Sequence, residues 1–533
     1  MNFNNLNIKK MKKKDCCYRL EKKVVFIMDK RKITKNYFFD VSYQVFALIV
    51  PIILTPYISR TLGVEQIGIY SFTYSIVSYF VLIATLGSST FAVKKIGEYK
   101  DFELRSISFF NVFIFRLFTS TLSLLAYILY SVFIMNCDLI VLLQCFYIIN
   151  VIFDITWFYQ GMEKYKNISI KNFVFKILSV IFIFIFVKDS NDLYLYIIGL
   201  VAFTILGNVS MWIGIRKHVN FKCLKKCKPF KNTKEIITMF FPTIAPQLFV
   251  YIDKTLIGVL ITEENIVVDT VFINGISYFE ERIVKVSNIE NGYYEQAEKI
   301  INMSSMLIIS LAYVNIPQIS YAFKNSDDDS IRNLLNNSFK FLWFLSIVMY
   351  IGVVCVSDYF TPLFFGEGYD KISTLLKILG LFYIFKGINN IVGIQYLIST
   401  GKEKIFSIFL IISGIINVFL KLILIPNYYS IGACIASVIG EFTLSVLCII
   451  YVLKNMVLSF KDVLGDVWKN VISGVVMIVI MESMKLFMSI SWVNLLLLVF
   501  FGSLTYIVVL LFFKNEFIFD IFRLLRKKIN GER

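Results

Sequence analysis

Charged side chains inside long apolar runs are the residues of this sequence best suited to do chemistry. The cations are Arg60, Arg116, Lys254, Lys386 and Lys421. The acids are Asp154, Asp253 and Glu441. An ionised group at the centre of a membrane helix costs about 2.5–3.5 kcal/mol on insertion scales, so such groups are rarely retained without a use. Each one alone is equally consistent with a structural ion pair or an interfacial anchor.

Taken together, these charges favour binding of an anion. Five cations against three acids would give a water-filled space lined by them a net positive charge. At an effective dielectric of about 20, a cation about 4 Å from a phosphate gains about 4 kcal/mol, comparable with the cost of its insertion. The set therefore predicts a site for an anionic substrate, although periodicity does not show that all five cations face one cavity.

The elements that carry these residues are apolar runs long enough to cross a bilayer as helices. Of the 533 residues, 57% are hydrophobic and only 17% are charged, against about 25% charged in soluble proteins. A span needs about 20 apolar residues, and about fourteen such runs occur. They lie at 37–59, 68–88, 108–133, 139–159, 168–187, 193–215, 236–260, 300–319, 335–356, 372–398, 405–425, 431–453, 471–488 and 493–513. The sequence thus predicts an all-α polytopic membrane protein.

The basic residues orient these spans. Lysine and arginine collect in cytoplasmic loops of membrane proteins, and here they alternate with loops that are almost free of them. The net charge of +17 is therefore assigned to the membrane topology and not to nucleic acid. Both termini are predicted to be cytoplasmic in a bacterial cytoplasmic membrane.

The same loops suggest a domain organisation. A basic tail, 1–35, precedes the first span, and Met28 within it is an alternative translation start. A basic linker, 216–235, separates an N-lobe of spans 1–6, 36–215, from a C-lobe of spans 7–12, 236–453. A C-terminal pair of spans and a basic tail occupy 454–533. Transporters are commonly built from repeated halves with a substrate site between them.

Other motifs give little evidence of metal binding or catalysis. Cys223, Cys227 and His218 are potential metal ligands, but their spacing fits no standard zinc signature, so no metal or other cofactor is expected. The chain contains no GxxxxGK[ST] phosphate-binding loop and no convincing catalytic Ser, His and Asp set. These features predict a transporter and not an enzyme.

A longer set of motifs resembles a known family. The chain reads YQVFALIVPIILTPYISRTLGVEQIGIYSF near its start, then FDITWFYQGMEKYKN, YIDKTLIGVL, NGYYEQAEKI, GIQYLIST and INVFLKLILIPNYYSIGACIASVIGE. These blocks lie in order over nearly the whole chain. They resemble the oligosaccharide-lipid flippases, usually called Wzx, of the multidrug/oligosaccharidyl-lipid/polysaccharide exporter superfamily.

The resemblance implies a fold and an activity. It implies two six-helix lobes around a central cavity, plus a C-terminal helix pair. It implies that undecaprenyl-diphosphate-linked oligosaccharide is moved from the cytoplasmic to the outer leaflet for capsule, O-antigen or related glycan assembly, with a glycan polymerase as a possible partner. Matching the family blocks onto this sequence selects Arg60, Asp154, Asp253, Lys254, Gln395 and Glu441. We predict Arg60, Arg116, Lys254, Lys386, Lys421 and Gln395 to bind substrate, and the three acids to hold a coupling ion or form salt bridges.

Two departures from the family pattern stand out. A charged segment from Glu263 to Glu290 replaces a usually short external loop, and Lys421 stands where asparagine is expected. The energy source is left open between a proton or Na⁺ gradient and the membrane potential, because no ATPase motif is present.

Three alternatives are weighed against the flippase. A multidrug exporter of the same superfamily would carry cations, which an excess of intramembrane cations disfavours. A membrane glycan polymerase or ligase would usually need a large external loop with clustered catalytic residues. A flippase for peptidoglycan precursors is closest in chemistry, and the sequence does not separate it from the preferred function. The sugars of the substrate and the oligomeric state are not encoded in any motif that we recognise.

Overall fold

The computed structural model describes residues 4–99, 101–273, 276–519 and 523, and most of them are helical. The chain divides into two compact units by its internal contacts. Unit 1 comprises Met1–Leu54, Phe80–Val187 and Tyr194–Phe241. Unit 2 comprises Thr55–Tyr79, Lys188–Leu193 and Pro242–Arg533.

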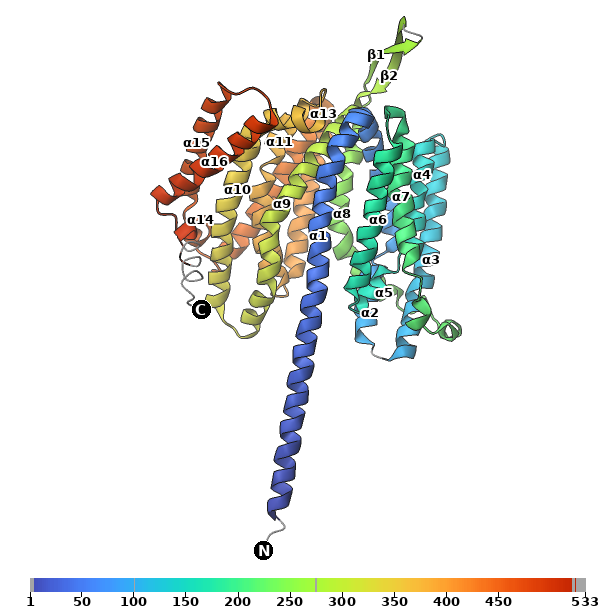
Figure 1. The fold of residues 1–533 in the computed structure, drawn as a ribbon, viewed down its shortest axis with the longest axis vertical. Coiled ribbons are helices and arrows are strands. Elements are labelled where there is room, and N and C mark those ends of the chain that lie inside the picture. Colours follow the sequence, from blue (N-terminus) through green and yellow to red (C-terminus); the bar gives the residue numbers. More distant parts are fainter. Residues whose placement is uncertain (1–3, 100, 274–275, 520–522, 524–533) are drawn as a thin grey trace. The chain divides into compact units, whose positions relative to one another are not determined.

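Unit 1 is a helical bundle, drawn from blue to green in Figure 1. Its elements are part of α1 (Asn4–Thr85), then α2 (Ser88–Glu98), α3 (Phe102–Phe133), α4 (Leu139–Phe153), α5 (Thr156–Gly161), α6 (Tyr165–Phe186), α7 (Leu193–Ser210), η2 (Ile215–Lys217), η3 (Phe221–Lys226) and the start of α8 (Thr233–Leu260). Its core is aromatic, since the Phe109 ring lies 5.5 Å from that of Trp157 and 4.9 Å from that of Phe158. The DITWF motif therefore has a packing role besides any functional one.

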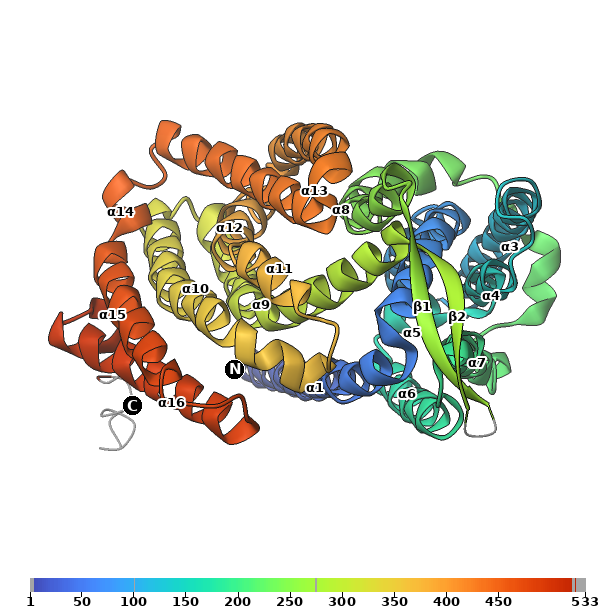
Figure 2. The ribbon, with the colours of Figure 1, turned by 90° about the horizontal axis from the view of Figure 1, so that it is seen from above.

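Unit 2 contains the remaining helices. They are η1 (Ser190–Asp192), α9 (Val286–Lys324), α10 (Asp328–Phe365), α11 (Lys371–Leu379), α12 (Phe382–Asn389), the π-helical η4 (Asn390–Ile398), α13 (Glu403–Lys454), α14 (Phe460–Leu464), α15 (Val467–Lys485) and α16 (Trp492–Phe512). Seen from above, α11 and α12 lie among α9, α10 and α13 (Figure 2). Buried side chains of these five helices form one apolar core.

The second arm of α1 belongs to unit 2, whereas the sequence-based division assigned all of 36–215 to the N-lobe. Gly63 has a left-handed φ of 77°, which glycine adopts without strain, and it bends α1. Beyond the bend, a Cβ on Gly68 would lie 1.6 Å from the carbonyl oxygen of Asn288, and one on Gly292 would lie 2.1 Å from that of Val64. Two glycines thus let the backbones of α1 and α9 touch.

The helices confirm a multi-pass membrane protein. Ten of the described helical stretches are long and apolar enough to cross a bilayer, or eleven if the bent pair in α9 is one span. Two of the ten, 46–98 and 403–454, exceed twice the length that one crossing needs, and they bend at Gly63 and Tyr429. The span number of about fourteen stays a prediction.

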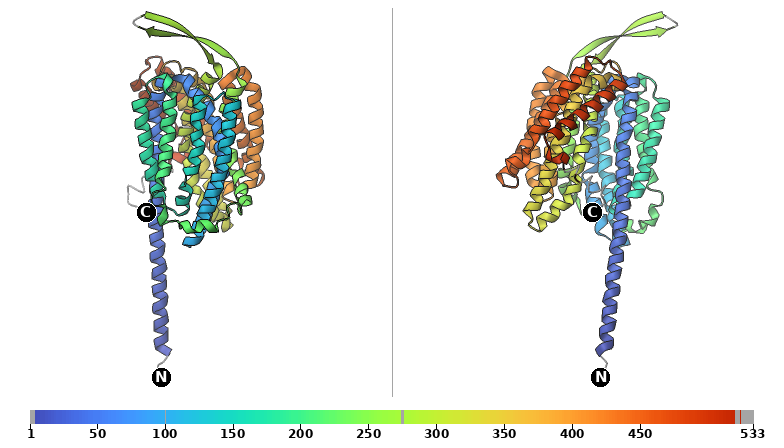
Figure 3. Two further views of the ribbon diagram at one scale, coloured as in Figure 1. Left: turned by 90° about the vertical axis from the view of Figure 1, so that its right-hand side faces the viewer. Right: turned by 60° about the vertical axis from the view of Figure 1, so that its left-hand side comes forward.

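The segment from Glu263 to Glu290 corrects the purely helical expectation. Strands β1 (Glu264–Ile273) and β2 (Ile276–Lys285) pair antiparallel, with Glu264 opposite Lys285 and Ile273 opposite Ile276. The hairpin extends beyond the ends of α8 and α9 (Figures 1 and 3). Its sequence is rich in valine and isoleucine, which favour strands, but the sequence analysis considered only its charge and length.

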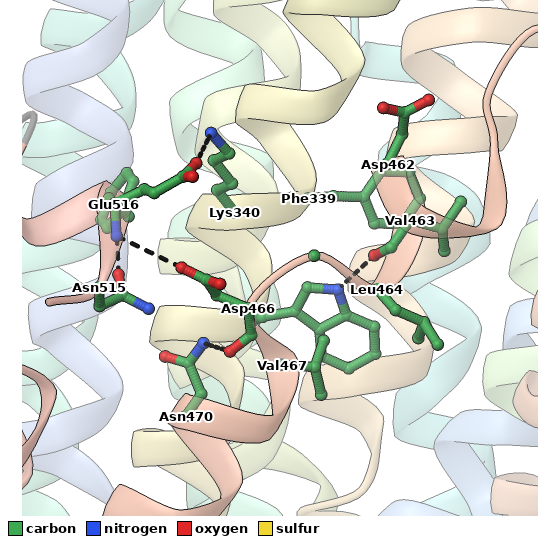
Figure 4. A pocket seen from close by; sticks show the side chains of 13 residues that line it. Phe339, Lys340, Asp462, Val463, Leu464, Asp466, Val467, Asn470, Asn515 and Glu516 are labelled. Carbon is green, nitrogen blue, oxygen red and sulfur yellow. Dashed lines mark hydrogen bonds and ion pairs between the residues drawn. The ribbon is translucent and has the colours of Figure 1, made fainter. Parts of the chain in front are cut away.

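The C-terminal helix pair is fastened to α10 by polar contacts (Figure 4). Lys340 Nζ lies 2.6 Å from Glu516 Oε2, and the Trp343 indole nitrogen donates to the Val463 carbonyl oxygen at 2.7 Å. The cavity among these residues measures about 10 Å³, which is the space of about one water molecule. This polar cluster therefore has a structural role.

Cysteine labelling tests the predicted topology of the hairpin. Ile283 on β2 is 67% exposed, so in a variant whose native cysteines are serine we expect Ile283→Cys to react with a membrane-impermeant maleimide in intact cells. A matched Lys225→Cys in the basic linker should react only after the membrane is permeabilised. Labelling with the opposite pattern would show that the hairpin is cytoplasmic and the basic linker external, which contradicts the predicted orientation.

Candidate substrate site

A cavity of about 250 Å³ in unit 2 gathers several of the predicted residues. Its wall is built from α8, α9, α12 and α13. The charged residues that line it are Asp253, Glu298, Lys386, Lys421 and Glu441. Four of these five were predicted from the sequence, and Glu298 was not.

Asp253 and Lys421 form a buried ion pair at this cavity. Their side chains are 7% and 1% exposed, and the Lys421 ammonium contacts Asp253 Oδ1 directly. The second carboxylate oxygen accepts hydrogen bonds from Ser437 Oγ at 3.0 Å and from the Tyr294 hydroxyl. The charge of Asp253 is therefore already compensated by a side chain of the protein.

The bend in α13 brings both arms of this helix to Asp253. Tyr429 has a φ of 52° inside the helix, and residues on either side of it, Lys421 and Ser437, both reach Asp253. A Cβ on Gly440 would lie 2.7 Å from Asn417 Nδ2, so the two arms pack closely. Residues 16 positions apart in the chain thereby meet at one carboxylate.

Lys254 points to a second set of acids. Its ammonium contacts Glu295 and lies 3.3 Å from Glu298 Oε2. Glu295 also accepts a hydrogen bond from Ser71 Oγ at 3.1 Å and lies 3.8 Å from Lys299. The NGYYEQAEKI motif therefore supplies carboxylates three residues apart, on one face of α9, to hold a buried lysine.

Lys386 differs from the other two lysines. It donates to Asn302 Oδ1 at 2.8 Å and lies 4.3 Å from the centre of the Phe382 ring. No ion pair of Lys386 is found among the residues that the structure describes. Across the cavity lining, Glu441 accepts from Asn389 Nδ2 at 2.7 Å. Lys386 thus makes no direct ion pair within the described part of unit 2, although Glu298, on the same cavity wall, interacts with it electrostatically.

Arg60 and Gln395 do not line this cavity. Arg60 is exposed and donates from Nη2 to the Leu363 carbonyl oxygen at 2.6 Å, in the last turn of α10. It thereby satisfies one of the carbonyls that a helix end leaves unpaired. Gln395 is buried and accepts from Ser338 Oγ at 2.9 Å. Their predicted contact with substrate stays a prediction.

Unit 1 brings Arg116 and Asp154 together. Arg116 Nη2 lies 3.1 Å from Asp154 Oδ2, and the Thr156 amide donates to Asp154 Oδ1 at 2.9 Å. The Trp157 indole donates to the Asp154 carbonyl oxygen at 3.0 Å. The pair therefore holds the turn between α4 and α5 as well as balancing two charges.

The charges of unit 2 are more evenly balanced than the sequence analysis expected. Two lysines, at 386 and 421, line the cavity with three carboxylates, at 253, 298 and 441. Beside them, the lysines at 254 and 299 pair with the carboxylate at 295, and Lys254 also pairs with Glu298. The sequence analysis did not single out Glu295, Glu298, Lys299 or Asn302. The three-residue spacing of the two glutamates on a helix that also carries Tyr294 was the signal that could have found the first two.

The fold defines a class of protein, and solved structures share it. The lipid II flippase MurJ in an inward closed conformation has a TM-score of 0.67 at 17% identity, covering 90% of this chain and all of that one. An inward-facing multidrug resistance MATE transporter of the MOP superfamily has a TM-score of 0.57 at 14% identity, covering 78% of this chain and 94% of that one. The chain thus shares its fold with these two proteins.

Sequence comparison gives the family. A profile described as polysaccharide biosynthesis protein matches residues 33–323, and the chain belongs to this family. A second profile with the same description matches 283–374. An Escherichia coli K12 protein described as an O-antigen transporter is 22% identical over 81% of this chain and 99% of its own length. Its Shigella dysenteriae counterpart is 23% identical over 76% and 95%. These matches confirm the resemblance to the Wzx-type flippases.

Removing Lys421 should destabilise unit 2. Lys421→Met leaves Asp253 as a buried carboxylate without a counter-charge, a change that costs about 3–5 kcal/mol. We expect the melting temperature of the purified protein to fall by several degrees. Lys421→Met combined with Asp253→Asn should recover most of the loss, because both charges are then gone.

The control for the variants at Lys421 and Asp253 is Arg332→Gln. Arg332 pairs with Asp462 at 2.5 Å but is half exposed, so its loss should cost no more than about 1 kcal/mol. A double variant as unstable as Lys421→Met would show that the lysine stabilises through packing and not through its charge.

Proposed function

We propose that this protein flips undecaprenyl-diphosphate-linked oligosaccharide from the cytoplasmic to the outer leaflet of a bacterial membrane. The observation that carries the proposal is membership of the polysaccharide biosynthesis family over residues 33–323. The O-antigen transporters and a Haloferax volcanii protein described as a glycan biosynthesis flippase, 21% identical over 54% of this chain and 56% of its own, support it.

The cavity of unit 2 supplies groups that suit both parts of such a substrate. The Lys386 ammonium would pair with the diphosphate, because an ammonium binds phosphate as a point charge. Glu441, Glu298 and Asn417 present oxygens that accept hydrogen bonds from sugar hydroxyls. The side-chain oxygen of Asn417 is buried and has no hydrogen-bond partner among the described residues, so a hydroxyl would satisfy it. Alternating access would expose this polar lining to either side in turn.

The ion pairs bear on the energy source. A coupling cation at Asp253 or Asp154 would have to displace Lys421 or Arg116, respectively, from its carboxylate. The membrane potential needs no such site, since outward movement of a negative charge gains about 2.3 kcal/mol at about 100 mV. We therefore propose that the potential biases transport of the diphosphate.

Flipping is tested in proteoliposomes that contain polyprenyl-diphosphate oligosaccharide. The signal is the fraction of sugar that becomes accessible to a membrane-impermeant sugar-modifying enzyme. We expect Lys386→Gln and Glu441→Gln each to slow exposure at least about tenfold, the loss of one charge-assisted contact.

The matched control is Lys377→Gln, which removes an exposed lysine that pairs with Asp358 at 2.7 Å and should leave the rate unchanged. Arg60→Gln separates two roles, because a helix-capping arginine would affect stability and not flipping. A wild-type protein that exposes no sugar with several repeat units would contradict the proposed function.

An imposed potential tests the coupling. A potassium diffusion potential, negative inside, should accelerate outward flipping, and collapsing it at constant pH and constant Na⁺ should remove the acceleration. The control is a pH or Na⁺ gradient imposed at zero potential, which should have little effect. Stimulation by either gradient alone would favour an ion-coupled cycle through Glu441.

Export of cationic compounds is a second candidate. It is favoured by the three carboxylates that line the cavity of unit 2. Uptake of a cationic dye into inverted vesicles would separate it from flipping.

A further inference from the structure

A second cavity lies within unit 1, at the end that the basic loops predict to be cytoplasmic. It measures about 330 Å³, a size within the range of ligand sites. Its wall comes from the end of α2, the first turn of α3, the turn between α5 and α6, and the residue after η2. The polar residues that line it are Tyr99, Arg105, Glu163, Lys164 and His218.

Local structure fixes the positions of these side chains. A Cβ on Gly161 would lie 2.6 Å from Ile96 Cβ, so α5 packs closely on α2. Asp101 caps α3 by accepting from the amides of Glu103 and Leu104 at 2.8 and 2.9 Å, which sets the turn that carries Arg105. Glu163 adopts a left-handed φ of 56°, a conformation that is uncommon for residues other than glycine and that recurs at functional sites.

Two of the basic side chains of this cavity are in direct contact. Lys164 Nζ lies 3.0 Å from His218 Nε2, so the ammonium donates to an imidazole nitrogen that must be unprotonated. The His218 ring is steadied by an edge contact with Tyr159, at 6.1 Å between centroids. The Nε of Arg105 is buried and has no hydrogen-bond acceptor among the described residues. A donor left unpaired in this way favours an incoming acceptor.

The electrostatic field at His218 is positive. Burial lowers the pKa of His218, and the neighbouring charges of Lys164, Arg105 and Lys217 lower it further. The other titratable groups on the cavity wall are the Glu163 carboxylate and the Tyr99 hydroxyl. A bound anion would counter these positive charges and would raise the pKa of His218 again.

We propose that this cavity binds a phosphate or diphosphate group at the inner rim of unit 1, with Arg105, Lys164 and His218 as its donors. The guanidinium matches two phosphate oxygens at once, and the ammonium adds a charge-assisted hydrogen bond. His218, unprotonated without the anion, becomes a charged donor when the bound phosphate raises its pKa and takes over its contact with Lys164. The phosphate has two possible sources, the head group of an anionic phospholipid and the diphosphate of a lipid-linked glycan. The second source rests on the proposed function and would make the cavity a capture site for substrate on the cytoplasmic side.

The sole histidine of the chain makes the test site-specific. The full-length protein, purified without a histidine tag and labelled on histidine, gives a single imidazole Cε1–H resonance. Titration with inorganic pyrophosphate should shift this resonance saturably and raise the pKa of His218. Arg105→Gln should weaken binding about tenfold, the effect of one charge-assisted contact, and Arg332→Gln should not change it.

Several outcomes would overturn the proposal. A wild-type resonance that does not respond to millimolar pyrophosphate, or that responds equally to chloride, excludes the site. Equal affinity of the wild type and Arg105→Gln excludes the assigned donor. If Arg105→Gln does not fold, Lys164→Gln takes its place, and the wild-type titration stands by itself.

Two further titrations identify the source of the phosphate. In nanodiscs of phosphatidylcholine, the addition of phosphatidylglycerol should shift the His218 resonance if the ligand is a phospholipid head group. The addition of polyprenyl diphosphate should shift it if the ligand is the lipid carrier of glycans. Because this readout needs no transport, retained pyrophosphate binding in a protein that does not flip glycan would contradict the proposed function and leave the phosphate site intact.

Discussion

A buried carboxylate needs a counter-charge, and this requirement organises the interior of unit 2. Asp253 is held by Lys421, Tyr294 and Ser437, which come from α9 and from both arms of α13. Three segments of chain are therefore tied to one charged group on α8. Taking either charge away would leave the other uncompensated in an apolar bundle, which is far more costly than losing an exposed pair.

The same requirement separates structural charges from charges available to a ligand. Lys254, Lys421 and Arg116 each have a carboxylate within contact distance, so their first role is to neutralise it. Lys386 has an amide and an aromatic ring for neighbours instead. Glu298 on the same cavity wall interacts with Lys386 electrostatically but forms no direct ion pair with it. Lys386 is therefore the best suited of the predicted residues to the proposed anionic substrate.

Two cavities in the chain then differ in character. The cavity of unit 2 mixes lysines with carboxylates and amides, a lining that suits a sugar with a charged attachment. The cavity of unit 1 is lined by an arginine, a lysine and a histidine with one glutamate. The two proposals, capture of a phosphate and passage of a sugar, therefore use separate sets of polar side chains.

The sequence by itself determined the class of this protein, because the length and apolarity of its runs leave few alternatives to membrane-spanning helices. It also determined the family, through motifs such as PYISRTLG and NGYYEQAEKI, and it identified Asp253, Lys386, Lys421 and Glu441, which share one cavity. It did not reveal the β-hairpin, whose strand-forming residues were considered only as a charged insertion.

Only the tertiary structure decided which charges meet. Asp253 and Lys421 are separated by 168 positions, and the bend at Tyr429 brings Ser437, from the other arm of α13, to the same carboxylate. Arg60 meets the end of α10, 303 positions away. Pairing of charges depends on distances between helices that are remote in sequence, and hydrophobic periodicity specifies each helix but not its neighbours. The net charge of a cavity therefore could not be obtained by counting the ionised residues in the spans.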